Sequence, residues 1–245
     1  FRSNVRSYHF NIYDNEFLDP EYIEGLIQST PTGMMTDRNI WGKWVAAEGA
    51  IYVDFCQDNW ISEADLEGVR FERYMAGVDW GYAHKGVISV WGVDADGCYY
   101  RLAEHAERYK DIDYWTDTAR KFQRKYRDIT FYCDPARQEY LQKFRQAGLS
   151  VRPAYNSVMS GISILASLYK TGRARVSNRE AACEHFKQEI YTYSYNDSGR
   201  DEPKKVNDDV MDADRYAVAS DFTQHAEGMQ TADDKLQMLS RYGLI

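Results

Sequence analysis

The sequence predicts a mixed α/β fold, in which helices cover the faces of a single mixed β-sheet. Three strand-like segments joined by tight connections follow one another within residues 75–106, which predicts an antiparallel meander. Short apolar strands then alternate with helical segments, and a last helix over residues 208–222 closes the order. Strands followed by α/β alternation pack their helices against the faces of a mixed sheet.

The N-terminal residues 1–70 are expected to form an appendage, because they contain no complete hydrophobic core. A short helix is predicted over residues 21–28, with Asp19 as its N-cap and Pro20 at its first position. Residues 50–55 have the composition of extended chain.

The meander is predicted from the side chains of its three runs. Residues 75–80 are apolar apart from a single aspartate, and residues 86–93 are β-branched and aromatic. The tetrapeptide DADG at 94–97 has the chemistry of a hairpin turn, and residues 98–106 return as the third strand.

Helical periodicity and apolar runs alternate after the meander. Over residues 112–126, Trp115 and Ala119 fall on one face of a helix. The same signals predict helices over 135–147, 157–169 and 179–190, and strands over 129–133, 151–154 and 173–177. Residues 191–195 and 204–206 flank a turn rich in Gly and Asp and are a candidate hairpin.

The composition excludes several classes of protein. A net charge of −8 at pH 7 argues against a protein that coats nucleic acid through bulk positive charge. It is compatible with a nuclease, which gathers carboxylates around metals. None of the four cysteines lies in a CxxC pair, so a zinc site is not expected. No apolar run approaches the ~18 residues of a membrane span, and no Walker-type phosphate loop is present.

Three aspartates occupy positions where a carboxylate needs a physical reason. Asp79 interrupts an apolar strand, where a buried and unpaired charge costs several kcal/mol. Asp134 follows the carboxyl end of the next strong strand, where α/β sheets build sites. Asp212 lies in the last helix, on the same side as Asp209. Carboxylates that converge from separate elements can hold two Mg²⁺ or Mn²⁺ ions about 3.5–4 Å apart, which activate a water for phosphodiester hydrolysis.

Each of these carboxylates also has a structural interpretation. Asp134 precedes a proline and could be a helix N-cap, Asp212 could lie on a solvated helix face, and Asp79 could pair with an arginine. For Asp208, capping of the last helix is the favoured role. The set of three is more specific than any one of its members.

Three ordered segments resemble the motifs of a known family. They read GVDWGYAHKG at 77–86, FYCDPAR at 131–137 and NDDVMDADRYAV at 207–218. The chain thereby resembles the C-terminal nuclease region of tailed-bacteriophage or prophage terminase large subunits, over roughly residues 8–222. The stretches 13–26 and 40–55 resemble the segment that joins the ATPase motor to the nuclease in that family.

The resemblance implies an RNase H-like fold. It divides the chain into a linker from the ATPase region (1–70), a nuclease domain (71–222) and a C-terminal tail (223–245). It further implies a metal-dependent endonuclease that cuts concatemeric double-stranded DNA during viral genome packaging in the host cell cytoplasm. The implied partners are duplex DNA, the ATPase domain of the same full-length chain, the terminase small subunit and the portal, with no membrane.

The resemblance also implies that Asp79, Asp134 and Asp212 are the catalytic, metal-binding carboxylates. Many relatives read D-H-x-x-D-A-L-R-Y in the last motif, whereas here Asp209 stands at the position of His and Asp214 at that of Leu. Asp209 is therefore expected to be a fourth ligand or to lie next to the ligands. The choice between Mg²⁺ and Mn²⁺ stays open.

Several basic residues are candidates for DNA contact. Lys204 and Lys205, just before the last motif, are expected to guide a DNA strand into the metal site. His84 is either a group that orients water or phosphate or an exposed loop residue. The dense basic cluster within 120–127 is a solvated helix face or a DNA contact, and Arg215 is expected to pair with a carboxylate of its own helix.

Three other functions remain as alternatives. One is another RNase H-like nuclease, such as a junction resolvase or hybrid nuclease, against which the linker-like segment argues. The second is an ATP binder of the actin or sugar-kinase type, which needs a second phosphate loop that the sequence lacks. The third is a non-catalytic packaging module that binds the portal or procapsid.

Overall fold

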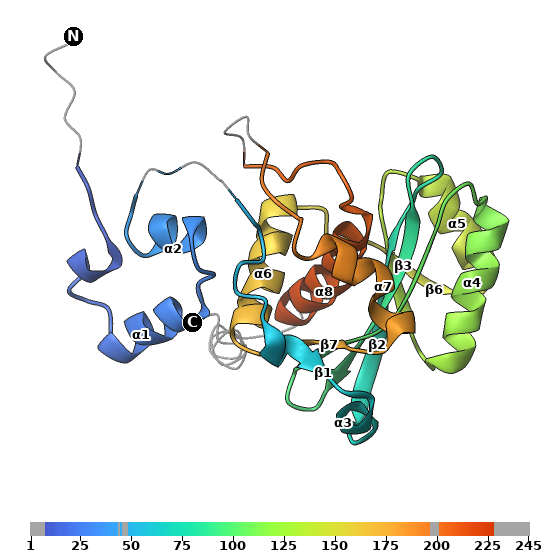
Figure 1. Cartoon of the computed structure of the whole chain (residues 1–245), viewed down its shortest axis with the longest axis horizontal. Helices are drawn as coiled ribbons and strands as arrows, with labels where there is room; N and C mark the ends of the chain where they lie inside the picture. Colours follow the sequence, from blue (N-terminus) through green and yellow to red (C-terminus); the bar gives the residue numbers. More distant parts are fainter. Residues whose placement is uncertain (1–7, 44, 46–48, 197–200, 228–245) are drawn as a thin grey trace, which may run out of the picture.

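A seven-stranded sheet in the order β1-β7-β4-β3-β2-β5-β6 forms the centre of the molecule (Figure 1). The computed structural model describes residues 8–43, 45, 49–196 and 201–227. The strands are β1 (Trp60–Ile61), β2 (Phe71–Asp79), β3 (Gly86–Asp94), β4 (Tyr99–Glu107), β5 (Thr130–Cys133), β6 (Ser150–Pro153) and β7 (Ala174–Ser177). Of these seven strands, β3 alone runs opposite to the others. The predicted mixed sheet and its antiparallel meander are confirmed.

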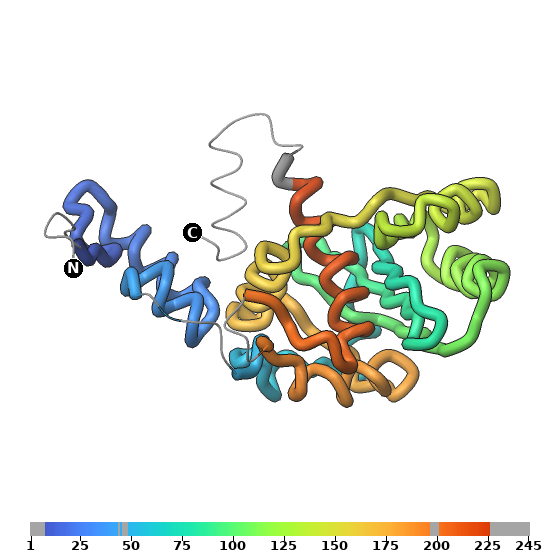
Figure 2. The backbone as a smooth tube through the Cα atoms, turned by 90° about the horizontal axis from the view of Figure 1, so that it is seen from above, coloured from blue at the N-terminus to red at the C-terminus, as the bar shows by residue number. Residues whose placement is uncertain are grey.

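Helices cover both faces of the sheet, as Figures 1 and 2 show. The helices of the described chain are α1 (Pro20–Ser29), α2 (Met34–Asn39), α3 (Glu63–Glu67), α4 (Ile112–Lys125), α5 (Gln138–Gln146), α6 (Val158–Lys170), α7 (Glu180–Glu189) and α8 (Asp209–Glu227), with 3-10 turns at Ile12–Asp14 and Gln57–Asn59. Leu165 of α6, Phe186 of α7 and Val210 of α8 share one apolar core. Trp115 of α4 and Phe144 of α5 belong to a second core on the other face. No helix in the described chain is long and apolar enough to cross a bilayer.

Helix α8 approaches the centre of the sheet very closely. A Cβ atom built on Gly77 of β2 would lie 1.8 Å from the carbonyl oxygen of Ala213, so only glycine fits there. Nearer the start of the same strand, Arg73 pairs with Asp221, near the end of α8, at 2.8 Å, so α8 runs antiparallel to β2. The first turn of α8 therefore reaches the carboxyl end of β2.

The N-terminal segment contributes directly to the sheet and its core. The predicted first helix is confirmed as α1, and the Asp19 side chain accepts a hydrogen bond from Glu21 N at 2.7 Å. The prediction of extended chain over residues 50–55 holds only at Ala50, which bridges to Ser194. Three side chains of this stretch enter the core beside α6, namely Ile51, Tyr52 and Phe55.

Strand β1 belongs to the segment 1–70 that the sequence predicts to be an appendage, yet it extends the sheet. Its two residues pair in parallel with β7, and so short a run carries no strand signal of its own. Helix α1 lies against α6, where Lys170 Nζ donates to the carbonyl oxygen of Ile27 at 3.3 Å.

Three local predictions need correction or lie outside the described residues. The helix expected over 135–147 begins only at Gln138, because the Asp134 carboxylate accepts a hydrogen bond from Ala136 N at 3.0 Å and forms a turn there. The candidate hairpin after residue 190 is reduced to an isolated bridge between Tyr195 and Pro203. The tail expected over 223–245 continues α8 as far as residue 227, and its remainder, 228–245, lies outside the described chain.

Candidate metal centre

The three aspartates singled out from the sequence come from three separate elements at one edge of the sheet. Asp79 is the last residue of β2, and Asp134 follows β5, the parallel neighbour of β2. The backbone N–H of Asp134 donates to the carbonyl oxygen of Val78 at 3.0 Å, so the two strands stay paired up to the site. Asp212 lies in the first turn of α8, whose start reaches this same edge.

All three side chains line one pocket of about 570 Å³. Its lining residues are Asp79, Trp80, His84, Arg108, Asp134, Lys205, Val206, Asn207, Asp208, Asp209, Asp212 and Tyr216. The pocket thus contains five carboxylates, including Asp209, the residue that replaces histidine in the family-like motif.

Negative charge is crowded in this pocket. Burial raises the pKa of Asp79 well above its usual range, and the nearby carboxylates of Asp212, Asp209, Asp134 and Asp208 raise it further. Among the described residues, no lysine or arginine forms an ion pair with Asp79, which argues against its structural interpretation. A cation other than a side chain is the natural partner of such a cluster.

The structural interpretations of the other two aspartates are wrong. The N-cap residue of α5 is Arg137, so Asp134 does not cap that helix. Asp212 is buried, with a relative exposure of 7%, and therefore does not lie on a solvated helix face. Both residues line the pocket instead.

Two basic side chains hold carboxylates at and just before the start of α8. Arg215 donates to Asp212 at 2.9 Å, which confirms the expected pairing within the helix. Lys205 Nζ lies 3.0 Å from both Asp208 and Asp212 while its side chain remains 67% exposed. Partial burial lowers the pKa of Lys205, but attraction to Asp212 and hydrogen bonds to both carboxylates outweigh it and raise the pKa overall.

The two lysines predicted to bind DNA differ in position. Lys205 lines the pocket, whereas its neighbour Lys204 does not. The backbone N–H of Lys204 donates to the carbonyl oxygen of Ser194 at 2.8 Å, which fixes the segment that carries both lysines.

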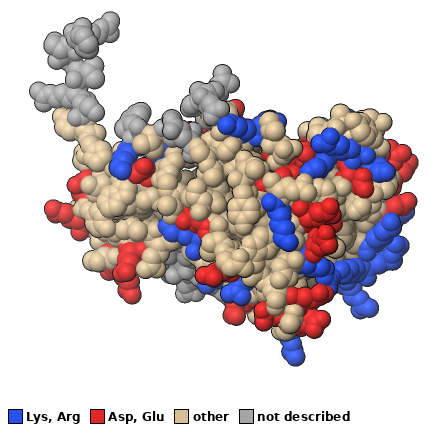
Figure 3. Space-filling model, in the orientation of Figure 1, with Lys and Arg blue, Asp and Glu red and all other residues tan. Residues whose placement is uncertain are grey.

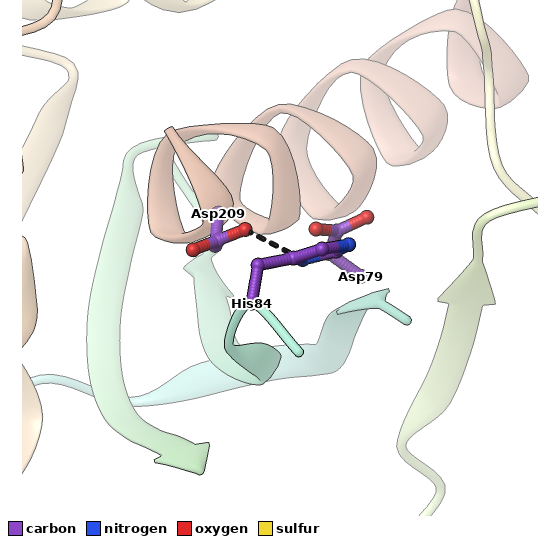
Figure 4. A group of neighbouring side chains, drawn as sticks. All are labelled: Asp79, His84 and Asp209. Carbon is purple, nitrogen blue, oxygen red and sulfur yellow. Dashed lines mark hydrogen bonds and ion pairs between the residues drawn. The ribbon is translucent and has the colours of Figure 1, made fainter. Parts of the chain in front are cut away.

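The register between β3 and β4 brings two further residues, His84 and Arg108, to the pocket. His84 lies in the loop between β2 and β3, and its Nδ1 is 3.0 Å from Oδ1 of Asp209 (Figure 4). Arg108, which sequence reasoning missed, follows the end of β4. The strand register pairs Gly86 with Glu107, so both residues lie at the site edge of the sheet. That register, combined with the predicted hairpin turn, is the signal that could have identified Arg108.

The basic cluster within 120–127 lies apart from the pocket, on and just after α4. Figure 3 shows Lys and Arg side chains gathered over this edge of the molecule. Its exposed members are Arg120, Lys121, Arg124, Lys125 and Arg127.

A buried ion network supports α8 beneath the pocket. Asp214 is fully buried and lies 2.9 Å from Arg101 Nε of β4. The same guanidinium lies 2.9 Å from Glu104. Burial raises the pKa of Asp214, and the neighbouring Arg101 partly opposes that shift.

The donor set of the pocket fits divalent cations. Mg²⁺ and Mn²⁺ prefer carboxylate oxygens, and carboxylates from different elements converge here around an open space. Residues Asp79, Asp134, Asp209 and Asp212 could therefore hold such ions.

Comparison with known proteins places this geometry in context. Residues 76–221 match the family model of the terminase RNase H-like domain. The terminase large subunit of Salmonella phage P22 is 40% identical over 81 residues, which cover 30% of this chain and 15% of that protein.

Solved structures show the same relationship. The large terminase of a thermophilic bacteriophage, solved in complex with ATP-gamma-S, superposes with a TM-score of 0.76 at 26% identity, covering 87% of this chain. This chain spans only 55% of that large terminase. The large terminase nuclease domain of bacteriophage SPP1, solved with bound Mn, has a TM-score of 0.52 at 17% identity, covering 72% of this chain and 99% of that domain. The SPP1 likeness concerns the fold alone.

Proposed function

Because the chain belongs to the terminase RNase H-like domain family, we propose that it is the endonuclease part of a phage DNA-packaging enzyme. In this proposal it cuts concatemeric double-stranded DNA by two-metal-ion hydrolysis of the phosphodiester bond. The observation that carries the proposal is the convergence of carboxylates from β2, β5 and α8 around one pocket.

The catalytic metal ligands would be Asp79, Asp134 and Asp212, with Asp209 as a fourth carboxylate. Two divalent ions, Mg²⁺ or Mn²⁺, would activate a water and stabilise the leaving 3′ oxygen. Mn is bound in the SPP1 nuclease domain, and the same ion is one of the two that we propose here. Arg215 would keep the Asp212 carboxylate turned toward the pocket through its contact at 2.9 Å.

The DNA phosphates would be met by basic side chains around the pocket. Lys205 and Arg108 line it, and both are exposed. Lys204 would contact the backbone further from the scissile bond. Phosphate contacts position a duplex without reading its sequence, so the cleavage would be tolerant of sequence and sensitive to salt.

The remaining assignments follow from the family. Residues 1–70 would connect to the ATPase domain of a longer chain, 71–222 would form the nuclease and 223–245 a tail. The terminase small subunit and the portal would be partners in the host cell cytoplasm. The 55% coverage of the large terminase from the thermophilic bacteriophage is compatible with a chain that works beside such a motor.

Cleavage of supercoiled plasmid tests the proposal. We expect nicking and linearisation with Mn²⁺ or Mg²⁺, no cleavage in EDTA, and a loss of at least about 100-fold in Asp79→Ala, because a ligand to the metal is removed. Asp117→Ala is the matched control, since that aspartate is exposed on α4.

The outcomes distinguish the alternatives. Faster cutting of a four-way junction or an RNA/DNA hybrid than of duplex DNA would favour another RNase H-like nuclease. Cleavage that survives in Asp79→Ala would refute the site. Absence of any cleavage, together with unchanged DNA packaging by Asp79→Ala in the full-length protein, would favour a non-catalytic module.

A further inference from the structure

His84 places an imidazole beside the carboxylate cluster, and it is not one of the aspartates that match the family motifs. Ligand atoms of Asp79, His84 and Asp209 all lie within 4.8 Å of one another. Figure 4 shows the ring beside both carboxylates, with Asp79 contributed by β2 and Asp209 by α8. His84 is thus the one histidine among the described residues that line this pocket.

The loop that carries His84 is tightly built. A Cβ atom on Gly81 would lie 2.1 Å from the carbonyl oxygen of Lys85, so the chain closes on itself at that glycine. Tyr109 N donates to the carbonyl oxygen of Tyr82 at 2.8 Å, and Lys85 Nζ lies 3.2 Å from Glu189. These contacts on both sides of His84 direct its ring toward the pocket although the side chain is 62% exposed.

The spacing of the donors suits a metal ion. Metal–ligand distances of about 2.0–2.2 Å place two adjacent ligands of an octahedral ion roughly 3 Å apart and two opposite ligands roughly 4.3 Å apart. His84 Nδ1 and Asp209 Oδ1 are 3.0 Å apart, and the three ligand atoms lie within 4.8 Å. In the structure this nitrogen lies at hydrogen-bond distance from Asp209 Oδ1 and, at 3.3 Å, from the carbonyl oxygen of Lys85, and a bound ion would replace the contact with Asp209.

We propose that His84 is a nitrogen ligand of the divalent cation held between Asp79 and Asp209, and that it makes this site select Mn²⁺ or Co²⁺ over Mg²⁺. The inference rests on the proposed metal-dependent function. It follows from the donor set, because imidazole suits transition metals whereas Mg²⁺ prefers oxygen ligands and retains its waters.

Electron spin echo envelope modulation of the Mn²⁺-loaded protein tests the nitrogen ligand directly. We expect nitrogen modulation in the wild type and in the control His9→Gln, whose histidine lies outside the pocket, and its loss in His84→Gln. Titration calorimetry should show that His84→Gln weakens Co²⁺ binding at least about tenfold and Mg²⁺ binding less than about twofold.

The outcomes separate this inference from the proposed function. Mn²⁺ that binds without nitrogen modulation would overturn the role of His84 and leave the carboxylate site intact. Modulation that persists in His84→Gln would assign the nitrogen to another residue and overturn it as well. If neither Mn²⁺ nor Co²⁺ binds the wild type, or if both bind Asp79→Asn with unchanged affinity, the proposed metal centre itself is refuted.

Discussion

Replacement of Asp214 by leucine should destabilise the protein, although leucine is the residue that the resemblance to the family motif would place there. The Asp214 carboxylate is fully buried, lies 2.9 and 3.0 Å from Arg101 Nε, and accepts a hydrogen bond from Trp91 Nε1 at 3.0 Å. Asp214→Leu would leave the Arg101 guanidinium buried with Glu104 as its remaining anion. Breaking a buried ion pair costs about 3–5 kcal/mol. Because Glu104 still compensates in part for the charge of Arg101, we expect Asp214→Leu to lower the free energy of unfolding by about 3 kcal/mol, which lowers Tm by roughly 6–12 °C.

The partner substitution, Arg101→Met, should add little to this loss when the two are combined. Arg101→Met alone leaves two buried carboxylates without their cation and should cost at least as much as Asp214→Leu. In the double variant only Glu104 remains, and it accepts hydrogen bonds from the backbone N–H groups of His185 at 2.6 Å and Phe186 at 3.2 Å. We therefore expect a favourable coupling energy of about 2–3 kcal/mol between the two substitutions.

Equilibrium urea unfolding followed by tryptophan fluorescence measures these free energies. Asp117→Leu on the exposed surface of α4 is the control and should change stability by less than about 0.5 kcal/mol. A loss below about 1 kcal/mol for Asp214→Leu would refute the reasoning. Additive losses in the double variant would do the same, because they would mean that the two groups do not compensate each other.

Three further predictions follow from the same structure. Asp79→Asn should raise Tm in EDTA, because it relieves repulsion among the carboxylates, and it should abolish the stabilisation by Mn²⁺. Scanning calorimetry with and without Mn²⁺ measures both changes in Tm. An undiminished rise of Tm on addition of Mn²⁺ would contradict the prediction. Gly77→Ala should prevent stable folding, because its Cβ would lie 1.8 Å from the Ala213 carbonyl oxygen, whereas Gly68→Ala meets nothing closer than 3.5 Å and should be tolerated; circular dichroism of the two purified variants decides. Lys205→Ala should tighten Mg²⁺ binding about two- to fivefold, because it removes a competing positive charge. The same substitution should weaken DNA binding and reduce its salt dependence. An equal loss of affinity for Mg²⁺ and for DNA would argue that the lysine only stabilises the fold.

Much of the fold could be predicted because its signals are local. Strand β3 is buried along nearly its whole length and is β-branched and aromatic, and the DADG turn that follows it joins it to β4. Helix α4 shows its apolar stripe within 14 residues. Short elements carry no such periodicity, which is why α2, α3 and β1 could not be recognised.

The candidate site could be predicted in part. Asp79, Asp134 and Asp212 stand out because each occupies an unusual position within its own segment, and the structure brings all three to one pocket. Whether a helix begins at Asp134 depends on a hydrogen bond to Ala136, which the Asp-Pro pair alone does not specify. The metal-ligand roles of the aspartates stay a prediction until they are tested in solution.

The sequence alone determined the succession of the longer strands and helices along the chain and the residues that differ from their apolar surroundings, since both depend on patterns a few residues long. Tertiary structure decided which distant groups meet. It placed Arg101 against Asp214, 113 residues away, His84 against Asp209, 125 residues away, and β1 at the edge beside β7. These contacts depend on strand order and on the height at which α8 packs over Gly77, and neither leaves a local signal in the chain.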